Sequence, residues 1–138
     1  MAVPQELIFD ATFTEDGGAV LLQDLDLTAA AGTAVTRQPG MEFQVNTETA
    51  SHQTISINGR GRYVAHDAAG NYVVVWMSNG QDGSGNGIFG QRYNAIGAPV
   101  GDEFPVNTTT SGFQNYPSLT MDNVGNFLVV WEGNGPTP

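Results

Sequence analysis

The sequence HDAAGNYVVVW, residues His66–Trp76, returns 55 positions later as MDNVGNFLVVW, residues Met121–Trp131. Both stretches open with an Asp-x-x-Gly-Asn turn and continue into an unbroken β-branched and aromatic run that ends at a tryptophan. Such a run, bounded by turn residues, is typical of a β-strand and is too short for a helix. A half-exposed strand would alternate polar and apolar residues. Both strands are therefore expected to be covered on both faces.

A second recurrence places a repeat around these strands. FQVNT, residues Phe43–Thr47, returns as FPVNT, residues Phe104–Thr108, with an offset of 61 positions instead of 55. The first copy therefore holds six more residues than the second, centred on residues 58–63. We predict an N-terminal β extension over residues 1–40, a first repeat over 41–101 and a partial second repeat over 102–138.

Three turns share one chemistry: Asp67–Gly70, Asn94–Gly97 and Asp122–Gly125. An Asp or Asn side chain opens such a turn by bonding the backbone that follows, and glycine adopts the positive φ that closes it. Gly70 and Gly125 are therefore structural residues, and each turn predicts a hairpin.

The predicted strands define the fold class. They lie near 118–121, 126–132, 88–93 and 98–106, so each unit is a four-stranded antiparallel meander. Units of this kind, stacked face to face, resemble the blades of a propeller, and their period is close to that of propeller arrays. We therefore expect an all-β fold with about two propeller-blade-like units; a β-sandwich built from the same strands is the alternative.

The two tryptophans, Trp76 and Trp131, hold equivalent positions in the two copies. We predict that both belong to the core, because equivalent aromatic residues in stacked units are usually packed between sheets. The alternative is a pair of platforms for sugars, which requires exposed rings.

The composition excludes several functions. Four basic residues, all of them arginine, stand against 14 acidic ones, which gives a net charge of −10. That field repels nucleic acids and anionic membranes, and no apolar run is long enough to cross a bilayer. Cysteine is absent, which removes disulfides and thiolate chemistry. Known catalytic motifs are also missing, so we predict a non-enzymatic protein without a resident cofactor.

One loop resembles the first half of a calcium site. Asp82, Ser84 and Asn86 place oxygen ligands at alternate positions before a glycine, as calcium loops do. The later ligand positions hold Gly90 and Tyr93, so a calcium ion would be bound weakly. The alternative is a flexible connector rich in glycine and asparagine.

The N-terminal segment is predicted to cap the repeats. Residues 1–27 hold six acidic side chains and no basic one, and two apolar stretches there flank a turn, so they can supply a hairpin or a donated strand. Fewer than two units leave sheet edges and faces open. The segment can cover its own chain or the chain of a neighbouring copy. In the second case, the arginines of the six-residue insertion would face the acidic segment of that neighbour. Alternatively, the insertion is a solvated loop. The predicted interaction residues are Arg60, Arg62, Glu15, Asp16, Asp24, Asp26, Leu7 and Phe9.

Residues 41–135 resemble a tandem repeat of very large, secreted, calcium-associated bacterial surface proteins. The resemblance rests on Phe-x-Val-Asn-Thr, on Asp-x-x-Gly-Asn-x-x-Val-Val-Trp, and on the glycine loop 78–85 that leads into 88–93. Residues 11–28 resemble the opening strands of cadherin-like repeats. The resemblance implies an extracellular or cell-surface location and carries no catalytic chemistry.

We therefore expect a structural or interaction protein that self-assembles, as a filament, a surface layer or a repeat of an adhesin. Backbone strand pairing and burial of the valine and tryptophan rows would hold such an assembly together. A glycan-binding module, with or without calcium, is the alternative.

Overall fold

The computed structural model describes residues 9–16, 19–27, 43–50, 52–55 and 61–134. Within them the chain is all-β and antiparallel, as predicted, and no segment forms a helix that could span a membrane. The strands are β1 (Phe9–Asp16), β2 (Ala19–Leu27), β3 (Phe43–Gln44), β4 (Gln53–Thr54), β5 (Val64–His66), β6 (Tyr72–Asn79), β7 (Asn86–Tyr93), β8 (Phe104–Pro105), β9 (Gln114–Met121) and β10 (Phe127–Gly133).

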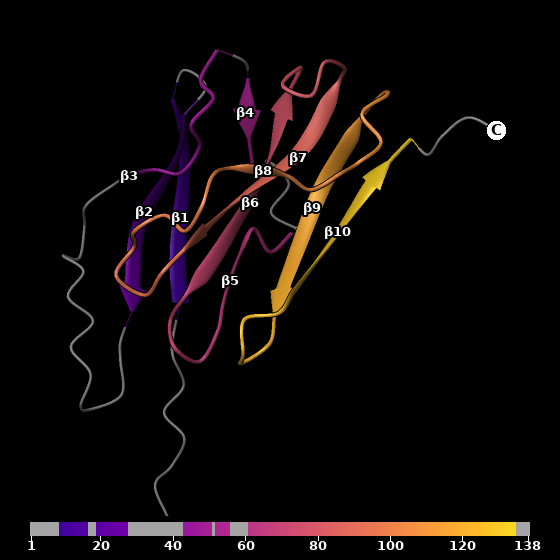
Figure 1. Ribbon diagram of the computed structural model, residues 1–138. Helices are drawn as coiled ribbons and strands as arrows, with labels where there is room; N and C mark the ends of the chain where they lie inside the picture. The colour runs from indigo at the N-terminus through magenta and orange to yellow at the C-terminus, as the bar shows by residue number, and fades with distance from the viewer. Residues whose placement is uncertain (1–8, 17–18, 28–42, 51, 56–60, 135–138) are drawn as a thin grey trace, which may run out of the picture.

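The strands form three sheets that lie in layers (Figure 1). The N-terminal sheet has the order β1-β2-β3. The central sheet has five strands, in the order β4-β6-β7-β8, with β5 also paired to β6. The C-terminal sheet consists of β9 and β10. The central sheet lies between the other two, so its strands have a neighbouring layer on each side.

Strand β6 is buried on both faces, as its unbroken apolar sequence predicts. Successive side chains of a strand point to opposite faces. Tyr72, Val74 and Trp76 belong to a cluster shared with Val45 and the N-terminal sheet. The intervening valines of β6 belong to a second cluster shared with the C-terminal sheet. Burial of each such side chain contributes about 1.5–3 kcal/mol to stability, so β6 is the centre of the core.

Polar groups inside the first cluster are hydrogen-bonded. The indole Nε1 of Trp76 donates to Oε1 of Gln53 at 2.8 Å, and Nε2 of Gln53 donates to Oγ of Ser78 at 2.6 Å. The hydroxyl of Tyr93 donates to the carbonyl oxygen of Val45 at 3.0 Å. Because a buried polar group without a partner is costly, these bonds fix Trp76 in one orientation between two sheets.

The three predicted turns have the predicted geometry. The backbone amide of Gly70 donates to the carbonyl oxygen of Asp67 at 3.2 Å, and the Asp67 carboxylate accepts two backbone amides further along the turn. The turn that begins at Asp122 repeats these bonds. Gly70 and Gly125 have φ values of 86° and 89°, so each occupies a conformation that favours glycine.

The six-residue difference between the copies falls between β4 and β5. In the C-terminal sheet one strand, β9, pairs with β10 from Gln114 to Met121. In the central sheet its place is taken by two short strands, since β4 pairs with one end of β6 and β5 with the other. The pairing positions agree, because Gln53 and Gln114 each lie opposite the residue two places after the tryptophan of the neighbouring strand.

The predicted strand 98–106 is much shorter in the structure. Only Phe104–Pro105 forms a strand, with an isolated bridge between Tyr93 and Pro99. Proline has no amide hydrogen to give to the ladder, and Gly101 has a φ of 72°, which interrupts an extended backbone. The pairing of this segment with β7 is therefore confined to its two ends.

The N-terminal hairpin, β1 and β2, is docked on its own chain. β2 pairs with β3 through Leu21 and Leu22, and β3 leads into Val45 of the first cluster. The N-terminal segment thus supplies two strands of a three-stranded sheet in its own chain, while its expected role as a cap or strand donor stays a prediction.

Candidate functional site

The largest departure from the sequence-based expectations lies at β10. The side chains of Leu128 and Val130 are 61% and 55% exposed, whereas their counterparts in β6, Val73 and Val75, are 2% and 0% exposed. The expectation that β10 is covered on both faces is wrong for the described part of the chain. The reason is topological: the face of β6 that holds its two valines is covered by the C-terminal sheet, and none of the described strands lies on the equivalent face of β10.

β10 also has one backbone edge to which no described strand is paired. β6 lies between β4 and β5 on one side and β7 on the other, whereas among the described strands β10 pairs with β9 alone. The C-terminal sheet is therefore two strands wide, whereas the central sheet is four strands wide, because β4 and β5 share one position beside β6. Unpaired amide and carbonyl groups at such an edge are a template for another strand.

The narrow C-terminal sheet leaves part of the central sheet open. Arg92 of β7 lies opposite Val73 of β6 in the ladder, so it projects from the face that the C-terminal sheet covers elsewhere. Its guanidinium carbon lies 4.4 Å from the ring centre of Phe104 and 5.1 Å from that of Phe127. Arg92 thus joins strand β8 of one sheet to strand β10 of the next.

Gly90 makes this arrangement possible. It pairs with Phe104 across the ladder between β7 and β8. A Cβ atom at position 90 would lie 3.0 Å from Cζ of Phe104 and 3.2 Å from the carbonyl oxygen of Val74. Phe104 therefore occupies the space of the missing side chain and turns its ring toward Phe127, with ring centres 6.2 Å apart.

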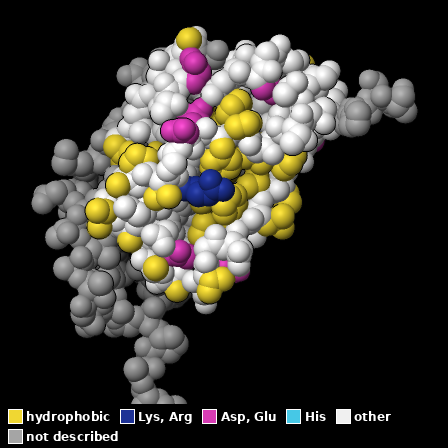
Figure 2. All heavy atoms as spheres, in the orientation of Figure 1, with side chains coloured by type: hydrophobic (Ala, Val, Ile, Leu, Met, Phe, Trp, Pro, Cys, Tyr) yellow, Lys and Arg dark blue, Asp and Glu magenta, His cyan; other side chains and the backbone are white. Residues whose placement is uncertain are grey.

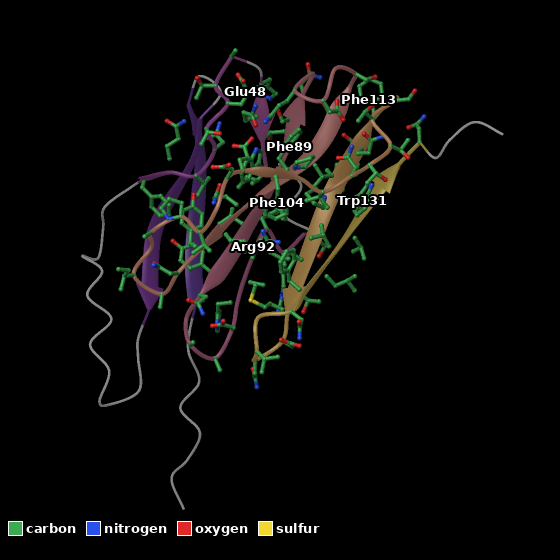
Figure 3. All side chains as sticks on the ribbon, in the orientation of Figure 1. Glu48, Phe89, Arg92, Phe104, Phe113 and Trp131 are labelled. Carbon is green, nitrogen blue, oxygen red and sulfur yellow. The ribbon has the colours of Figure 1, made fainter. Side chains whose placement is uncertain are left out.

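The space beside Arg92 is a hollow of about 290 Å³ between the central and C-terminal sheets. Its lining includes Val73, Met121 and Phe127 together with the charged residues Arg92 and Asp67. In Figure 2 a dark blue side chain lies among hydrophobic ones on this face, and Figure 3 labels Arg92 at that place. No ion pair forms between Arg92 and any acidic group among the residues that the structure describes. We call this hollow, with the adjacent free edge of β10, the β10 wedge.

Three aromatic rings are exposed near the other end of β10: Phe113, Tyr116 and Trp131. Trp131 is 40% exposed and Trp76 is fully buried, so the predicted core position holds for Trp76 and not for Trp131. Strand β9 has a bulge here, because the register shifts between Val130 and Glu132. Tyr116 takes the extra place in β9 with a φ of 53°, a conformation uncommon for a tyrosine.

The carboxylate at the β9–β10 turn is tightly held. Nδ2 of Asn126 donates to Oδ2 of Asp122 at 2.8 Å, and two backbone amides donate to Oδ1. The hydrogen bond from the Asn126 side chain lowers the pKa of Asp122 below its ordinary value; a desolvation contribution opposes this, and the backbone amides add to the lowering. The bonds to this carboxylate stabilise the turn between β9 and β10.

The loop predicted to bind calcium is occupied by internal hydrogen bonds. Oδ1 of Asp82 accepts from the backbone amide of Ser84, and Oδ2 accepts from Nδ2 of Asn107. Asn86 bonds the side chains of Asn79 and Asn115. In the described residues, no group of three or more His, Asp or Glu side chains is arranged to hold a metal. The hydrogen bond between Asn86 and Asn115 links this loop of the central sheet to β9. Calcium binding stays a prediction.

The predicted interaction residues fall into separate regions. Phe9, Glu15 and Asp16 belong to β1, while Asp24 and Asp26 belong to β2. Arg62 is exposed, and its carbonyl oxygen accepts the backbone amide of Leu119. Leu7 and Arg60 lie outside the described residues, so a contact between the insertion and the acidic segment remains a prediction.

Sequence reasoning missed the β10 wedge. Arg92 follows Gly90 and Gln91 in a strand without any local motif, and its two aromatic contacts come from β8 and β10. The available signal was indirect: Arg92 is one of only four basic residues in a chain of net charge −10.

Comparison with protein families, with curated proteins and with solved structures finds no match.

Proposed function

We propose that the protein is a non-enzymatic, extracellular structural or interaction protein that assembles with further copies of itself. The assembly would form through backbone strand pairing and burial of apolar sheet faces, in a filament, a surface layer or an adhesin repeat. In this proposal the three sheets are propeller-blade-like units of an array that the copies complete for one another.

One observation carries the proposal. The outer face of the C-terminal sheet exposes Leu128 and Val130 at the positions where β6 exposes Val73 and Val75 to the next layer. Within the molecule, the equivalent face of β6 is covered by the C-terminal sheet. A further sheet of the same kind could cover the outer face of β10 in the same way. Exposed aliphatic side chains in one row, next to a free strand edge, are the features that self-associating sheets share.

Burial of apolar sheet faces is the term that would drive the proposed association. Removing apolar surface from water yields about 25 cal/mol per Å², so a standard interface of about 1,600 Å² has enough apolar energy for stable contact. The net charge of −10 opposes association at low ionic strength. Added salt at physiological concentration should therefore strengthen contacts between sheet faces.

The test uses the double variant Leu128→Asp and Val130→Asp. Size-exclusion chromatography with light scattering should show a defined oligomer or polymer for the unmodified protein and a monomer for the variant. The matched control, Ile96→Asp with Val124→Asp, adds the same charge at exposed apolar residues of two turns. A monomeric unmodified protein at high micromolar concentration would disprove the proposal.

A second candidate is a glycan-binding module, favoured by the exposed rings of Phe113, Tyr116 and Trp131. Sugars stack on exposed aromatic faces. Binding should quench the fluorescence of Trp131, and Trp131→Ala should remove the response while Trp76 remains as the buried reference. Repeating the titration with millimolar Ca²⁺ and with a chelator tests whether Asp82, Ser84 and Asn86 assist.

A further inference from the structure

We infer that the β10 wedge is an acceptor site for strand β1 of a second copy, with Arg92 binding the carboxylates at the end of that strand. This inference rests on the proposed function and names the surfaces that would meet. It joins two strand edges that have no partner among the described strands, one in the C-terminal sheet and one in the N-terminal sheet.

The central sheet indicates what occupies the wedge. There the edge of β6 that corresponds to the free edge of β10 pairs with the antiparallel strand β7. A strand added to β10 in the same way would extend the C-terminal sheet over the open part of the central sheet, where Arg92 and Phe104 lie. The wedge therefore has the free edge of β10 on one side and a mainly apolar floor that also contains Arg92 and Asp67, and the Asp67 carboxylate is already bonded to its own turn.

β1 has the features that the wedge requires. It is an eight-residue strand, β10 has seven residues, and among the described strands β1 pairs only with β2. The N-terminal sheet of one copy, with three strands, and the C-terminal sheet of another, with two, would together make a sheet of five strands. The central sheet is four strands wide, because β4 and β5 share the position beside β6, so the joined sheet would be one strand wider.

The donor must come from another molecule. The N-terminal sheet packs on the face of β6 that holds Trp76, and the C-terminal sheet packs on the face that holds Val75. Figure 1 shows β1 and β10 on opposite sides of the central sheet. A strand cannot pair with an edge from which a whole layer separates it, so the contact is head to tail and generates rings or filaments.

Charge selects both the partner and the register. β1 carries Asp10, Glu15 and Asp16 and no basic residue. Antiparallel pairing over the full length of both strands places Glu15 and Asp16 beside Phe127, which is the end of β10 next to Arg92. Two acidic β1 strands repel each other, which disfavours pairing of β1 with β1 of another copy. Pairing of β1 with an edge that presents a cation is favoured instead.

The first experiment is a charge cycle measured by sedimentation velocity. Arg92→Gln should weaken self-association about 10- to 100-fold, the range for loss of a hydrogen bond to a charged group. Glu15→Gln with Asp16→Asn should weaken it similarly, and combining all three changes should add little, since each set removes the same contact. Circular dichroism spectra that match the spectrum of the unmodified protein show that the variants fold, a readout that weaker association does not by itself change.

Two controls make this cycle decisive. Asp24→Asn with Asp26→Asn removes the same acidic charge from β2, which is not an edge strand, and should leave association intact. Arg60→Glu with Arg62→Glu tests the rival docking place at the insertion. Loss of association in this variant, with none in Arg92→Gln, would overturn the inference.

The second experiment uses the absence of cysteine from the chain. The pair Leu128→Cys and Thr14→Cys lies near the expected register, so single-cysteine variants, mixed and oxidised, should form a disulfide between copies. Leu128→Cys mixed with Asp10→Cys lies out of register and should cross-link far less. Equal yields from both mixtures would exclude this pairing.

The outcomes separate this inference from the proposed function. If Arg92→Gln and the cross-linking mixtures have no effect while Leu128→Asp with Val130→Asp abolishes the oligomer, the copies assemble through sheet faces alone and the β1 assignment is wrong. If Arg92→Gln weakens binding of an added acidic sugar and not self-association, the wedge is a ligand site and the assignment is likewise wrong.

Discussion

Strands β6 and β10 have nearly the same sequence pattern and opposite environments. Seven of the eight residues of β6 are buried, whereas each residue of β10 is partly or largely exposed. The turn before each strand has the same hydrogen bonds, so the difference does not arise locally. It arises from the neighbours: β6 has a strand on each side and a sheet on each face. Sequence pattern thus determines that a strand forms, and topology determines whether the strand is core.

The largest expected contrast concerns the two tryptophans. Trp76→Ala should reduce the free energy of unfolding by about 3–5 kcal/mol, because it leaves a cavity between two sheets and an unpaired Gln53. Trp131→Ala should reduce it by about 1 kcal/mol, as expected for a partly exposed side chain. Urea unfolding followed by circular dichroism measures both. Equal losses would mean that β10 is as deeply packed as β6.

A smaller contrast concerns the glutamines beside these strands. Gln53→Ala should lower the free energy of unfolding by about 1–3 kcal/mol, since it leaves the buried Nε1 of Trp76 without an acceptor. Gln114 makes longer bonds, at 3.2 Å to the carbonyl oxygen of Ser111 and 3.4 Å to Asn107, so Gln114→Ala should cost less.

The matched control for Gln53 is the pair Gln53→Leu with Trp76→Phe. It removes both polar partners together and should recover part of the stability lost in Gln53→Ala. Failure to recover any of it would show that the 2.8 Å bond is not the source of the loss.

The smallest effect concerns the turn before β10. The pKa of Asp122 in the folded protein is lowered, chiefly by the Asn126 side chain. A lowered folded pKa means that the stabilisation is complete above the unfolded pKa and is lost as the pH falls through the folded one. Asp122→Asn should reduce stability at neutral pH and flatten the decline in acid. Thermal midpoints measured from pH 6 down to pH 2 would show this, and an unchanged acid slope would contradict it.

Much of the fold could be predicted from the sequence, because turns and apolar runs are local. Asp67 and Asp122 each mark a hairpin, and Tyr72–Trp76 indicates a strand that needs two covering layers. The length of β8 was harder to predict. The Phe-Pro-Val segment has residues typical of a strand, but Pro99 and Gly101 interrupt its pairing with β7.

The candidate site was beyond sequence reasoning. The exposure of Leu128 and Val130 depends on how many sheets the described chain provides, which apolar residues alone do not reveal. The position of Arg92 over Phe104 and Phe127 depends on three strands from two sheets. Gly90 gave a hint, because glycine within a strand often marks a close approach by another group.

The break between β4 and β5 has a practical consequence. Both short strands hold the same neighbour, β6, and β9 makes the equivalent pairing with a bulge at the corresponding point. The ladder therefore tolerates a change of chain length there without a shift of register at either end. An engineer could graft a peptide epitope or a fluorescent label between β4 and β5 and decorate the protein while its layers remain intact.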